Sequence, residues 1–153
     1  MVILVDADAC PVREQIELIV KKYGISCIMY CDTNHEINSD CCEVKTIGAG
    51  KDAVDLAIVN NCNKGDIVVT QDYGLAALIL SKSAYCIHPS GMIYDSDNID
   101  RLLLERHIGA KERKRTGRQI KGRNHVRNRD DDERFYQVLN NLVLQNRRKT
   151  DNV

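Results

Sequence analysis

The chain opens with the stretch VILVDADACPV at residues 2–12, in which an aliphatic run is followed by two aspartates and a proline. A continuous aliphatic run rich in β-branched residues is typical of a strand buried on both faces, in a sheet that helices cover on each side. Pro11 suits the first turn of a helix. An apolar stripe at helical spacing then runs up to Gly24 and consists of Val12, Ile16, Ile19, Val20 and Tyr23. The opening therefore predicts a strand, a loop and a helix.

The following part of the chain repeats this order. Aliphatic segments predict further strands at residues 25–30, 43–47, 66–70 and 84–88, and helical spacing predicts helices at residues 52–61 and 75–81. Strands that alternate with helices imply right-handed crossovers between parallel strands. We therefore expect an α/β protein with a three-layer α/β/α architecture and a mainly parallel sheet.

The last third of the chain has a different composition. A helix is predicted at residues 98–106, and a basic stretch containing Gly109, Gly117 and Gly122 follows it. A final helix is predicted at residues 130–147, because acidic residues precede an apolar stripe at helical spacing. We expect this helix to pack on the body. Residues 1–153 would then form one domain with an acidic body at 1–105, a basic segment at 106–129 and a C-terminal helix.

Length and composition fit this interpretation. The chain has 153 residues, of which 43% are hydrophobic and 29% charged, as expected for one globular domain with one core. No apolar run approaches the roughly 18 residues of a membrane span. The first aliphatic run is too short for a secretory signal and lacks a basic lead. We expect a cytoplasmic protein without a membrane partner.

The seven cysteines are predicted to be reduced thiols. Their number is odd, no secretory signal is evident, and they form no C-x-x-C pair. A zinc site built from Cys27 and Cys31, or from Cys41 and Cys42 with His35, is an alternative. It lacks the two well-spaced pairs that structural zinc usually has.

The charge is distributed unevenly although the net charge is zero. Residues 1–100 contain 15 acidic and 7 basic residues, a net charge of −8, whereas residues 101–153 contain 7 acidic and 15 basic residues, a net charge of +8. Residues 106–129 hold ten basic residues and a single acidic one, Glu112. Such a density indicates either a surface for polyanions or a solvated linker.

Aspartates stand where a site is expected in such a fold. In open α/β sheets the ligand binds beyond the carboxyl ends of the strands. Asp6 directly follows the first strand, Asp72 follows the strand at residues 66–70, and Asp8 lies two residues after Asp6. Asp52 and Asp55 are three residues apart and therefore share one face of a helix. If the two strands are neighbours, these five carboxylates meet at one edge of the sheet.

Carboxylates that converge in this way need a cation, because their mutual repulsion otherwise raises their pKa values. Oxygen ligands without histidine or thiolate favour Mg²⁺ or Mn²⁺. Asp8 and Asp52 can also be explained as helix N-caps. Asp66 precedes its strand and belongs to the opposite edge, so we exclude it.

Two other motifs fit less well. The segment GAGK at residues 48–51 lacks the spacing of a phosphate-binding loop, and Asp52 replaces the Ser or Thr that would meet Mg²⁺. The pattern Asp6-Ala7-Asp8 is also found in phosphatases of the haloacid-dehalogenase type, but the further motifs of that class are poorly matched.

Three ordered motifs carry a resemblance to a known family. They are ILVDADACPV at residues 3–12, GKDAVDLAI at residues 50–58 and DIVVTQDYGLA at residues 66–76. Together with Pro89-Ser90-Gly91 and the region of Asp131 and Phe135, they resemble the YaiI/YqxD family of uncharacterised bacterial proteins over nearly the whole chain. That family looks like a member of the PIN-like superfamily, whose nucleases use aspartates to hold Mg²⁺ or Mn²⁺ and cut RNA.

The resemblance implies a PIN-like fold and roles for individual residues. Asp6, Asp55 and Asp72 match the metal ligands of the superfamily. Asp8 and Asp52 match positions that the family also shows as acidic, and Asp52 would be a further metal ligand. Asp8 or Asp52 would position water. Independently of the resemblance, the basic charge of the chain's last third and the residues beside the aspartates suggest nucleic-acid contacts from Lys51, Thr70, Arg113, Lys114, Arg115, Arg118, Lys121 and Arg123.

The expected function is a metal-dependent phosphodiesterase that acts on RNA. The basic segment would follow the phosphate backbone, and its lack of aromatic residues argues against base stacking. Two alternatives remain open at this stage. One is a non-catalytic RNA-binding or regulatory protein with the same fold, and the other is a small-molecule phosphatase.

Overall fold

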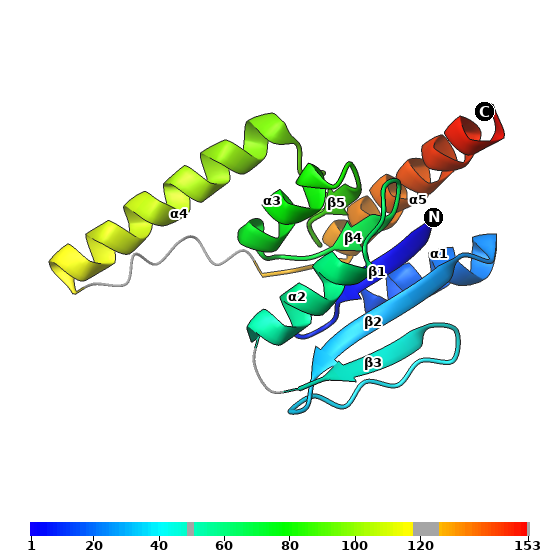
Figure 1. The fold of residues 1–153 in the computed structure, drawn as a ribbon, viewed down its shortest axis with the longest axis horizontal. Coiled ribbons are helices and arrows are strands. Elements are labelled where there is room, and N and C mark those ends of the chain that lie inside the picture. Colours follow the sequence, from blue (N-terminus) through cyan, green and yellow to red (C-terminus); the bar gives the residue numbers. More distant parts are fainter. Residues whose placement is uncertain (49–50, 118–125, 153) are drawn as a thin grey trace.

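The computed structural model describes residues 1–48, 51–117 and 126–152 (Figure 1). The five strands are β1 (Val2–Asp6), β2 (Ser26–Asp32), β3 (Glu43–Ile47), β4 (Ile67–Val69) and β5 (Tyr85–Ile87). The helices of the described part are α1 (Arg13–Tyr23), α2 (Lys51–Asn61), α3 (Tyr73–Ser81), α4 (Ser96–Thr116) and α5 (Arg129–Asp151).

The strands form one parallel sheet in the order β3-β2-β1-β4-β5. Strands β2 and β3 are added on one side of β1. The chain then crosses back, and β4 and β5 are added on the other side of β1. The strand order therefore changes direction between β1 and β4. In open parallel sheets such a switch point opens a crevice at the carboxyl ends of the two strands. Asp6 ends β1, and the register aligns Val5 with Val69 of β4.

Helices cover both faces of the sheet, which confirms the predicted three-layer α/β/α architecture. The side chains of β1 alternate between two cores, with Ile3 and Val5 on one face and Leu4 on the other. The first core lies against α1 and α5, and the second lies against α2, α3 and the start of α4. All three side chains are at most 1% exposed. This explains why β1 is aliphatic throughout.

The first helix follows the sequence prediction closely. Ile16, Ile19 and Val20 are buried, as the apolar stripe predicts. Gly24 ends the helix in the left-handed conformation, with φ of 61°, and its N–H donates to Val20 O. A glycine accepts this conformation without steric cost. The predicted end of the helix at Gly24 is therefore confirmed.

Helix α4 is longer than predicted. The sequence indicated a helix at residues 98–106 followed by a separate basic segment, but the helix begins at Ser96 and continues to Thr116. Gly109 does not interrupt it. Lysine and arginine are good helix formers, and pairs such as Arg115 with Glu112 and Arg101 with Glu105 support the exposed turns. Residues 106–116 are thus helical, and the second half of α4 projects away from the body (Figure 1).

Helix α5 begins with a capping box, in which Asn128 accepts from Asp131 N and Asp131 accepts from Asn128 N. Its buried stripe, which includes Phe135, Leu139 and Val143, packs into the core beside α1. Near its end, Asn146 Nδ2 donates to Gly65 O over 2.6 Å. None of the helices described here combines the length and the apolar character needed to cross a membrane.

Candidate functional site

A single hydroxyl joins the ends of β1 and β4. The register of these strands places Thr70 beside Asp6, and the Thr70 hydroxyl donates to Asp6 Oδ2 over 2.9 Å. The same Oγ1 accepts from Asp72 N over 3.0 Å. Tyr94, which is buried, donates from its hydroxyl to Thr70 O over 3.2 Å. Thr70 is only 1% exposed. Its hydroxyl holds the side chain of Asp6 and the backbone of Asp72, and so fixes the positions of both aspartates.

The Asp72 side chain is also oriented by the helix that follows it. Asp72 is the N-cap of α3, and its Oδ1 accepts from Leu75 N over 3.1 Å. A cap of this kind satisfies one of the amide groups that a helix leaves open at its start. A β-carbon on Gly74 would lie 3.2 Å from Asp72 Oδ1, so glycine leaves room for the carboxylate. Asp72 is therefore held both by Thr70 and by α3.

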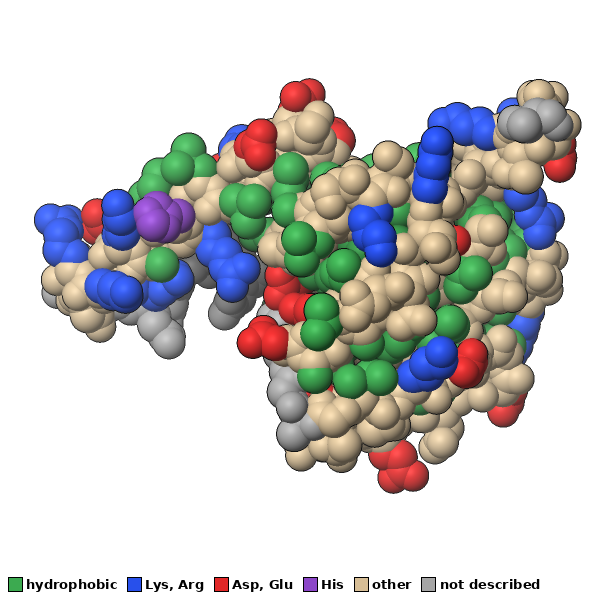
Figure 2. Space-filling view, in the orientation of Figure 1, with side chains coloured by type: hydrophobic (Ala, Val, Ile, Leu, Met, Phe, Trp, Pro, Cys, Tyr) green, Lys and Arg blue, Asp and Glu red, His purple; other side chains and the backbone are tan. Residues whose placement is uncertain are grey.

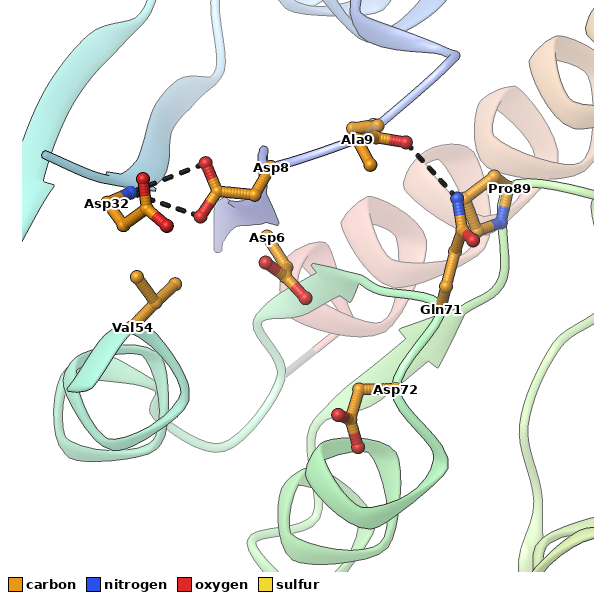
Figure 3. A pocket seen from close by; sticks show the side chains of 9 residues that line it. Asp6, Asp8, Ala9, Asp32, Val54, Gln71, Asp72 and Pro89 are labelled. Atoms are coloured by element: carbon orange, nitrogen blue, oxygen red, sulfur yellow. Dashed lines mark hydrogen bonds between the residues drawn. The ribbon is translucent and has the colours of Figure 1, made fainter. Parts of the chain in front are cut away.

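A pocket of about 430 Å³ opens at this edge of the sheet (Figure 3). The acidic side chains that line it are Asp6, Asp8, Asp32 and Asp72, and the remaining lining residues are Ala9, Cys10, Val54, Gln71 and Pro89. Gln71 Nε2 donates to Ala9 O over 3.3 Å, which ties the loop after β4 to the loop after β1. The predicted placement of Asp6, Asp8 and Asp72 at one edge is thus observed.

Asp32 and His35 belong to this edge as well, although Asp32 was not predicted as a site residue and His35 was considered only as a zinc ligand beside Cys41 and Cys42. Asp8 accepts from Asp32 N with both oxygens, at 3.3 and 3.1 Å. His35 Nδ1 lies 2.8 Å from Asp32 Oδ1 and 3.1 Å from Asp8 Oδ1. The predicted strand ended at Tyr30, whereas β2 runs to Asp32. With that strand end, the rule that selected Asp6 would have selected Asp32 too.

The charges in this trio shift the pKa values of two of its members. The hydrogen bond with Asp32 raises the pKa of His35, and the negative charge of Asp8 adds to the effect. The hydrogen bonds from His35 and from Asn34 N lower the pKa of Asp32. The side chain of His35 is 51% exposed. Asp8, Asp32 and His35 therefore form a solvent-facing hydrogen-bonded group at the rim of the pocket, and its contacts favour the protonated imidazole.

The predicted aspartates of α2 line a neighbouring pocket. This second pocket has a volume of about 560 Å³ and is lined by Asp52, Asp55, Leu56, Val59, Asp72, Gly74, Leu75, Leu78 and Arg106. Oδ1 of Asp55 is buried. Asp72 lines both pockets and is the residue that connects them. The five predicted carboxylates therefore lie along one edge but are shared between two adjoining hollows.

The ligand atoms of the predicted metal ligands lie farther apart than those of a closed metal site. Among the described residues, two groups place three or more ligand atoms within 4.8 Å of one another, namely Asp8, Asp32 and His35, and Glu17, Cys41 and Cys42. Asp6, Asp55 and Asp72 do not form such a group. Asp66 lies at the opposite edge, as predicted, and accepts from Val2 N and Asn63 N.

The predicted nucleic-acid contacts lie partly inside and partly outside the described residues. Arg113, Lys114 and Arg115 are exposed on the last turn of α4. Lys51 begins α2, but its side chain lies outside the described part of the structure. Arg118, Lys121 and Arg123 lie outside it entirely. The Thr70 hydroxyl is buried and hydrogen-bonded to Asp6 and Asp72, and its predicted contact with phosphate stays a prediction.

The donor set of the first pocket suits a hard divalent cation. Its four acidic side chains offer oxygen ligands, which Mg²⁺ and Mn²⁺ prefer. Cys10 also lines the pocket, and burial raises its pKa to about 11. It is the one thiol among four carboxylates there. All seven cysteines are free, as predicted. The residues present therefore fit a carboxylate-bound Mg²⁺ or Mn²⁺ ion and do not favour a thiolate-bound metal at this edge.

Fold and site together define a class of protein: a small parallel α/β/α protein with a carboxylate-lined pocket at its topological switch point. The chain belongs to the YaiI/YqxD family of uncharacterised bacterial proteins, whose family model, described as "Uncharacterized BCR, YaiI/YqxD family", matches residues 4–145. The predicted family membership is therefore confirmed.

Individual relatives match over nearly their whole length. The chain is 49% identical to a UPF0178 protein of Clostridium acetobutylicum over 144 residues, which cover 94% of this chain and 97% of that protein. It is 50% identical to a UPF0178 protein of Clostridium tetani over 143 residues, with 94% and 97% covered. A UPF0178 protein of Natranaerobius thermophilus is 46% identical over 145 residues, with 95% and 97% covered. No solved structure matches the chain at a significant level.

Proposed function

We propose that this protein is a Mg²⁺- or Mn²⁺-dependent phosphodiesterase that acts on RNA. The observation that carries the proposal is the grouping of Asp6, Asp8, Asp32 and Asp72 around one pocket at the carboxyl ends of neighbouring parallel strands. Four carboxylates around one pocket repel one another unless a cation is bound. The motif resemblance to PIN-like nucleases points in the same direction.

Asp6 and Asp72 are the proposed metal ligands, with Asp55 and Asp52 contributing from the side of the second pocket. Thr70 holds Asp6, and α3 holds Asp72, so the positions of both ligands are set before any ion binds. A metal bound by such groups activates water and stabilises the charge that develops on a phosphodiester. Preorganised ligands are important here, because carboxylates that had to reorient during the reaction would slow it.

Asp8 is the proposed group that orients the attacking water. Its two oxygens accept from Asp32 N, and His35 lies against one of them, which restricts the side chain to one orientation. The carboxylate still lines the pocket together with Asp6. A base or orienting group must lie within hydrogen-bond reach of the water on which it acts. Asp8 therefore suits this role, because its orientation is fixed and it lines the same pocket as the proposed ligands Asp6 and Asp72.

The basic residues of α4 are the proposed contacts to the RNA backbone. Figure 2 shows Lys and Arg side chains along α4 and acidic side chains on the facing edge of the body. Arg106 lines the second pocket with Asp52 and Asp55, so positive charge reaches the rim of the carboxylate site. Arg113, Lys114 and Arg115 extend this charge to the end of the helix. A row of this kind attracts a polyanion without reading its sequence.

A cleavage assay with single-stranded RNA and Mn²⁺ tests the proposal. The double variant Asp6→Asn with Asp72→Asn should lose activity, and the control Asp97→Asn with Asp100→Asn, which removes two exposed charges from α4, should retain it. Cleavage that survives the first double variant would refute the proposed site. Preparations should be compared at equal folded concentration, judged by circular dichroism.

A non-catalytic RNA-binding protein is the second candidate. It is favoured by the looser placement of Asp6, Asp55 and Asp72, whose ligand atoms do not all lie within 4.8 Å of one another. Salt-sensitive RNA binding without any cleavage would support this candidate. Hydrolysis of a generic phosphomonoester with no effect on RNA would instead indicate a small-molecule phosphatase, for which a pocket of about 430 Å³ is large enough.

A further inference from the structure

A second group of potential metal ligands lies on the α1 side of the sheet. Cys41 and Cys42 directly precede β3, Cys27 is the second residue of β2, and Glu17 lies on α1. Ligand atoms of Glu17, Cys41 and Cys42 all lie within 4.8 Å of one another. The register of β2 and β3 pairs Ile28 with Glu43, so the preceding residues, Cys27 and Cys42, lie next to each other. Two thiols and one carboxylate therefore meet at one point, and the thiol of Cys27 lies beside Cys42, just outside this group.

The sulfur spacing fits a tetrahedral metal. Cys41 Sγ and Cys42 Sγ are 3.7 Å apart. Two thiolates bound to one tetrahedral zinc ion, each at about 2.3 Å, lie roughly 3.8 Å apart. A disulfide would need about 2.05 Å between the sulfurs. The two thiols thus already have the separation of co-ligands.

Ser39 holds the cluster together. Its hydroxyl donates to Glu17 Oε1 over 2.7 Å and accepts from Cys42 N over 3.1 Å. A hydroxyl that hydrogen-bonds to a ligating carboxylate is a typical outer partner of a metal site, since it fixes the orientation of the ligand. The contact with Cys27 lowers the pKa of Cys42, whereas the contact with Cys42 raises the pKa of Cys27 and burial raises the pKa of Cys41. A metal bound here would therefore displace protons from Cys27 and Cys41.

Burial and exposure also suit a closed site with one entrance. Cys27 is 4% and Cys42 is 8% exposed, whereas Cys41 and Glu17 are only half-buried. An ion can therefore reach the cluster past Cys41 and Glu17 and be enclosed by the two buried thiols. His35 lies with Asp8 and Asp32 instead, so the zinc site that the sequence suggested from Cys41, Cys42 and His35 does not form.

We propose that Cys27, Cys41, Cys42 and Glu17 bind one Zn²⁺ ion in a tetrahedral structural site. Three sulfurs and one oxygen complete the four-coordinate shell that structural zinc requires, and no position is left open for substrate. The site is separate from the carboxylate pocket, because Cys27 stands at the start of β2 and Asp32 at its end. Bound zinc would fasten the connection between β2 and β3 to α1.

Cobalt provides a direct probe of this site, because Co²⁺ bound to thiolates absorbs in the near ultraviolet by charge transfer. The full chain is reduced, freed of metal and titrated with Co²⁺, and Zn²⁺ is then added as a competitor. We expect one equivalent of Co²⁺ to give the thiolate band and one equivalent of Zn²⁺ to abolish it. Absence of the band at one equivalent would overturn the proposal.

Variants identify the ligands. Cys41→Ser and Glu17→Gln change half-buried side chains and should leave the fold intact while weakening Zn²⁺ binding at least about tenfold. Cys62→Ala, in the opposite core, should bind as the wild type does. Equal binding by Cys41→Ser and Cys62→Ala would refute the site. X-ray absorption on the zinc-loaded wild type gives a readout independent of variants, with three sulfur neighbours at about 2.3 Å expected and a shell of only oxygen and nitrogen contradicting the proposal.

Discussion

The Thr70 hydroxyl donates a hydrogen bond of 2.9 Å to Asp6 Oδ2 and thereby joins the residues that end β1 and follow β4. Because the same hydroxyl accepts from Asp72 N, one side chain sets the positions of two aspartates in the pocket. The two strands are neighbours only because the chain crosses back over β1. The pocket is thus a direct product of the sheet topology.

Replacing Thr70 by valine tests this relationship. Thr70→Val keeps the shape of the side chain but leaves Asp6 Oδ2 and Asp72 N without the Thr70 hydroxyl. We expect a loss of about 1–3 kcal/mol in the free energy of unfolding, the typical effect of removing a buried hydrogen-bond partner. Thr70→Ser retains the hydroxyl and should recover most of this loss. Denaturant unfolding of both variants measures the difference, and equal stability of Thr70→Val and the wild type would contradict it.

Asparagine variants at opposite edges of the sheet should behave in opposite ways. Asp6→Asn keeps an oxygen that can accept from Thr70, so the metal-free protein should keep nearly its stability but lose the stabilisation that Mn²⁺ confers. At a Mn²⁺ concentration of 100 Kd this stabilisation is about 2.7 kcal/mol. Asp66→Asn removes one of the two carboxylate oxygens that accept from Val2 N and Asn63 N.

The expected result for Asp66→Asn is a loss of about 1–3 kcal/mol without metal and an unchanged response to Mn²⁺. Thermal unfolding with and without Mn²⁺ measures both quantities. If Asp6→Asn and Asp66→Asn lost the Mn²⁺ response to the same extent, the effect would not arise from the pocket.

His35 should titrate above the ordinary histidine pKa of 6.5, because it contacts Asp32 and Asp8. The raised pKa stabilises the fold below pH 6.5, and this contribution is lost as the pH rises through the folded-state value. The lowered pKa of Asp32 acts in the other direction, so its contribution is present above pH 3.8 and is lost as the pH falls through its folded-state value. The pair is therefore most stabilising between pH 3.8 and 6.5.

An NMR titration of the imidazole protons measures this directly. Asp32→Asn removes the largest cause of the shift and should return the His35 pKa toward 6.5. Asp8→Asn should have a smaller effect. His88 is an internal contrast, since burial lowers its pKa. A His35 resonance that titrates at or below 6.5 in the wild type would show that the contacts with Asp32 and Asp8 do not hold in solution.

Neutralising the end of α4 should weaken RNA binding without affecting the fold. The triple variant Arg113→Gln, Lys114→Gln and Arg115→Gln changes exposed side chains, so its unfolding temperature should stay close to that of the wild type. If each cation neutralises one phosphate, the slope of log K against log salt concentration should become about 2 units less steep.

A control with the same change in charge carries Lys21→Gln, Lys64→Gln and Arg148→Gln, three exposed residues outside α4. Fluorescence anisotropy at several salt concentrations compares the two variants. An equal loss of affinity in both would indicate that only the net charge of the molecule is important.

Much of the fold could be predicted because its strongest signals are local. The aliphatic runs of β1 and β4 and the apolar stripe of α1 identify these elements, and Asp6 and Asp72 follow from their positions after strands. The length of α4 could not be predicted in the same way. Its second half buries little apolar surface, so no periodic signal distinguishes an exposed basic helix from a basic loop.

The details of the site depend on contacts that sequence spacing does not reveal. Thr70 and Asp6 are 64 residues apart, and only the register between β1 and β4 brings the hydroxyl to the carboxylate. The ends of strands are the least reliable part of a sequence prediction. Ending β2 at Tyr30 instead of Asp32 was enough to miss Asp32 and, with it, His35.

Locating Mn²⁺ in crystals soaked with the ion tests the central claim most directly, because its anomalous scattering identifies the metal independently of the side chains. We expect an anomalous peak in the pocket at the carboxyl ends of β1 and β4, within about 2.0–2.6 Å of carboxylate oxygens of Asp6 and Asp72. The peak should be absent in crystals of the Asp6→Asn and Asp72→Asn double variant. A wild-type pocket without Mn²⁺, or an ion bound only by Asp8, Asp32 and His35, would contradict the proposed metal site.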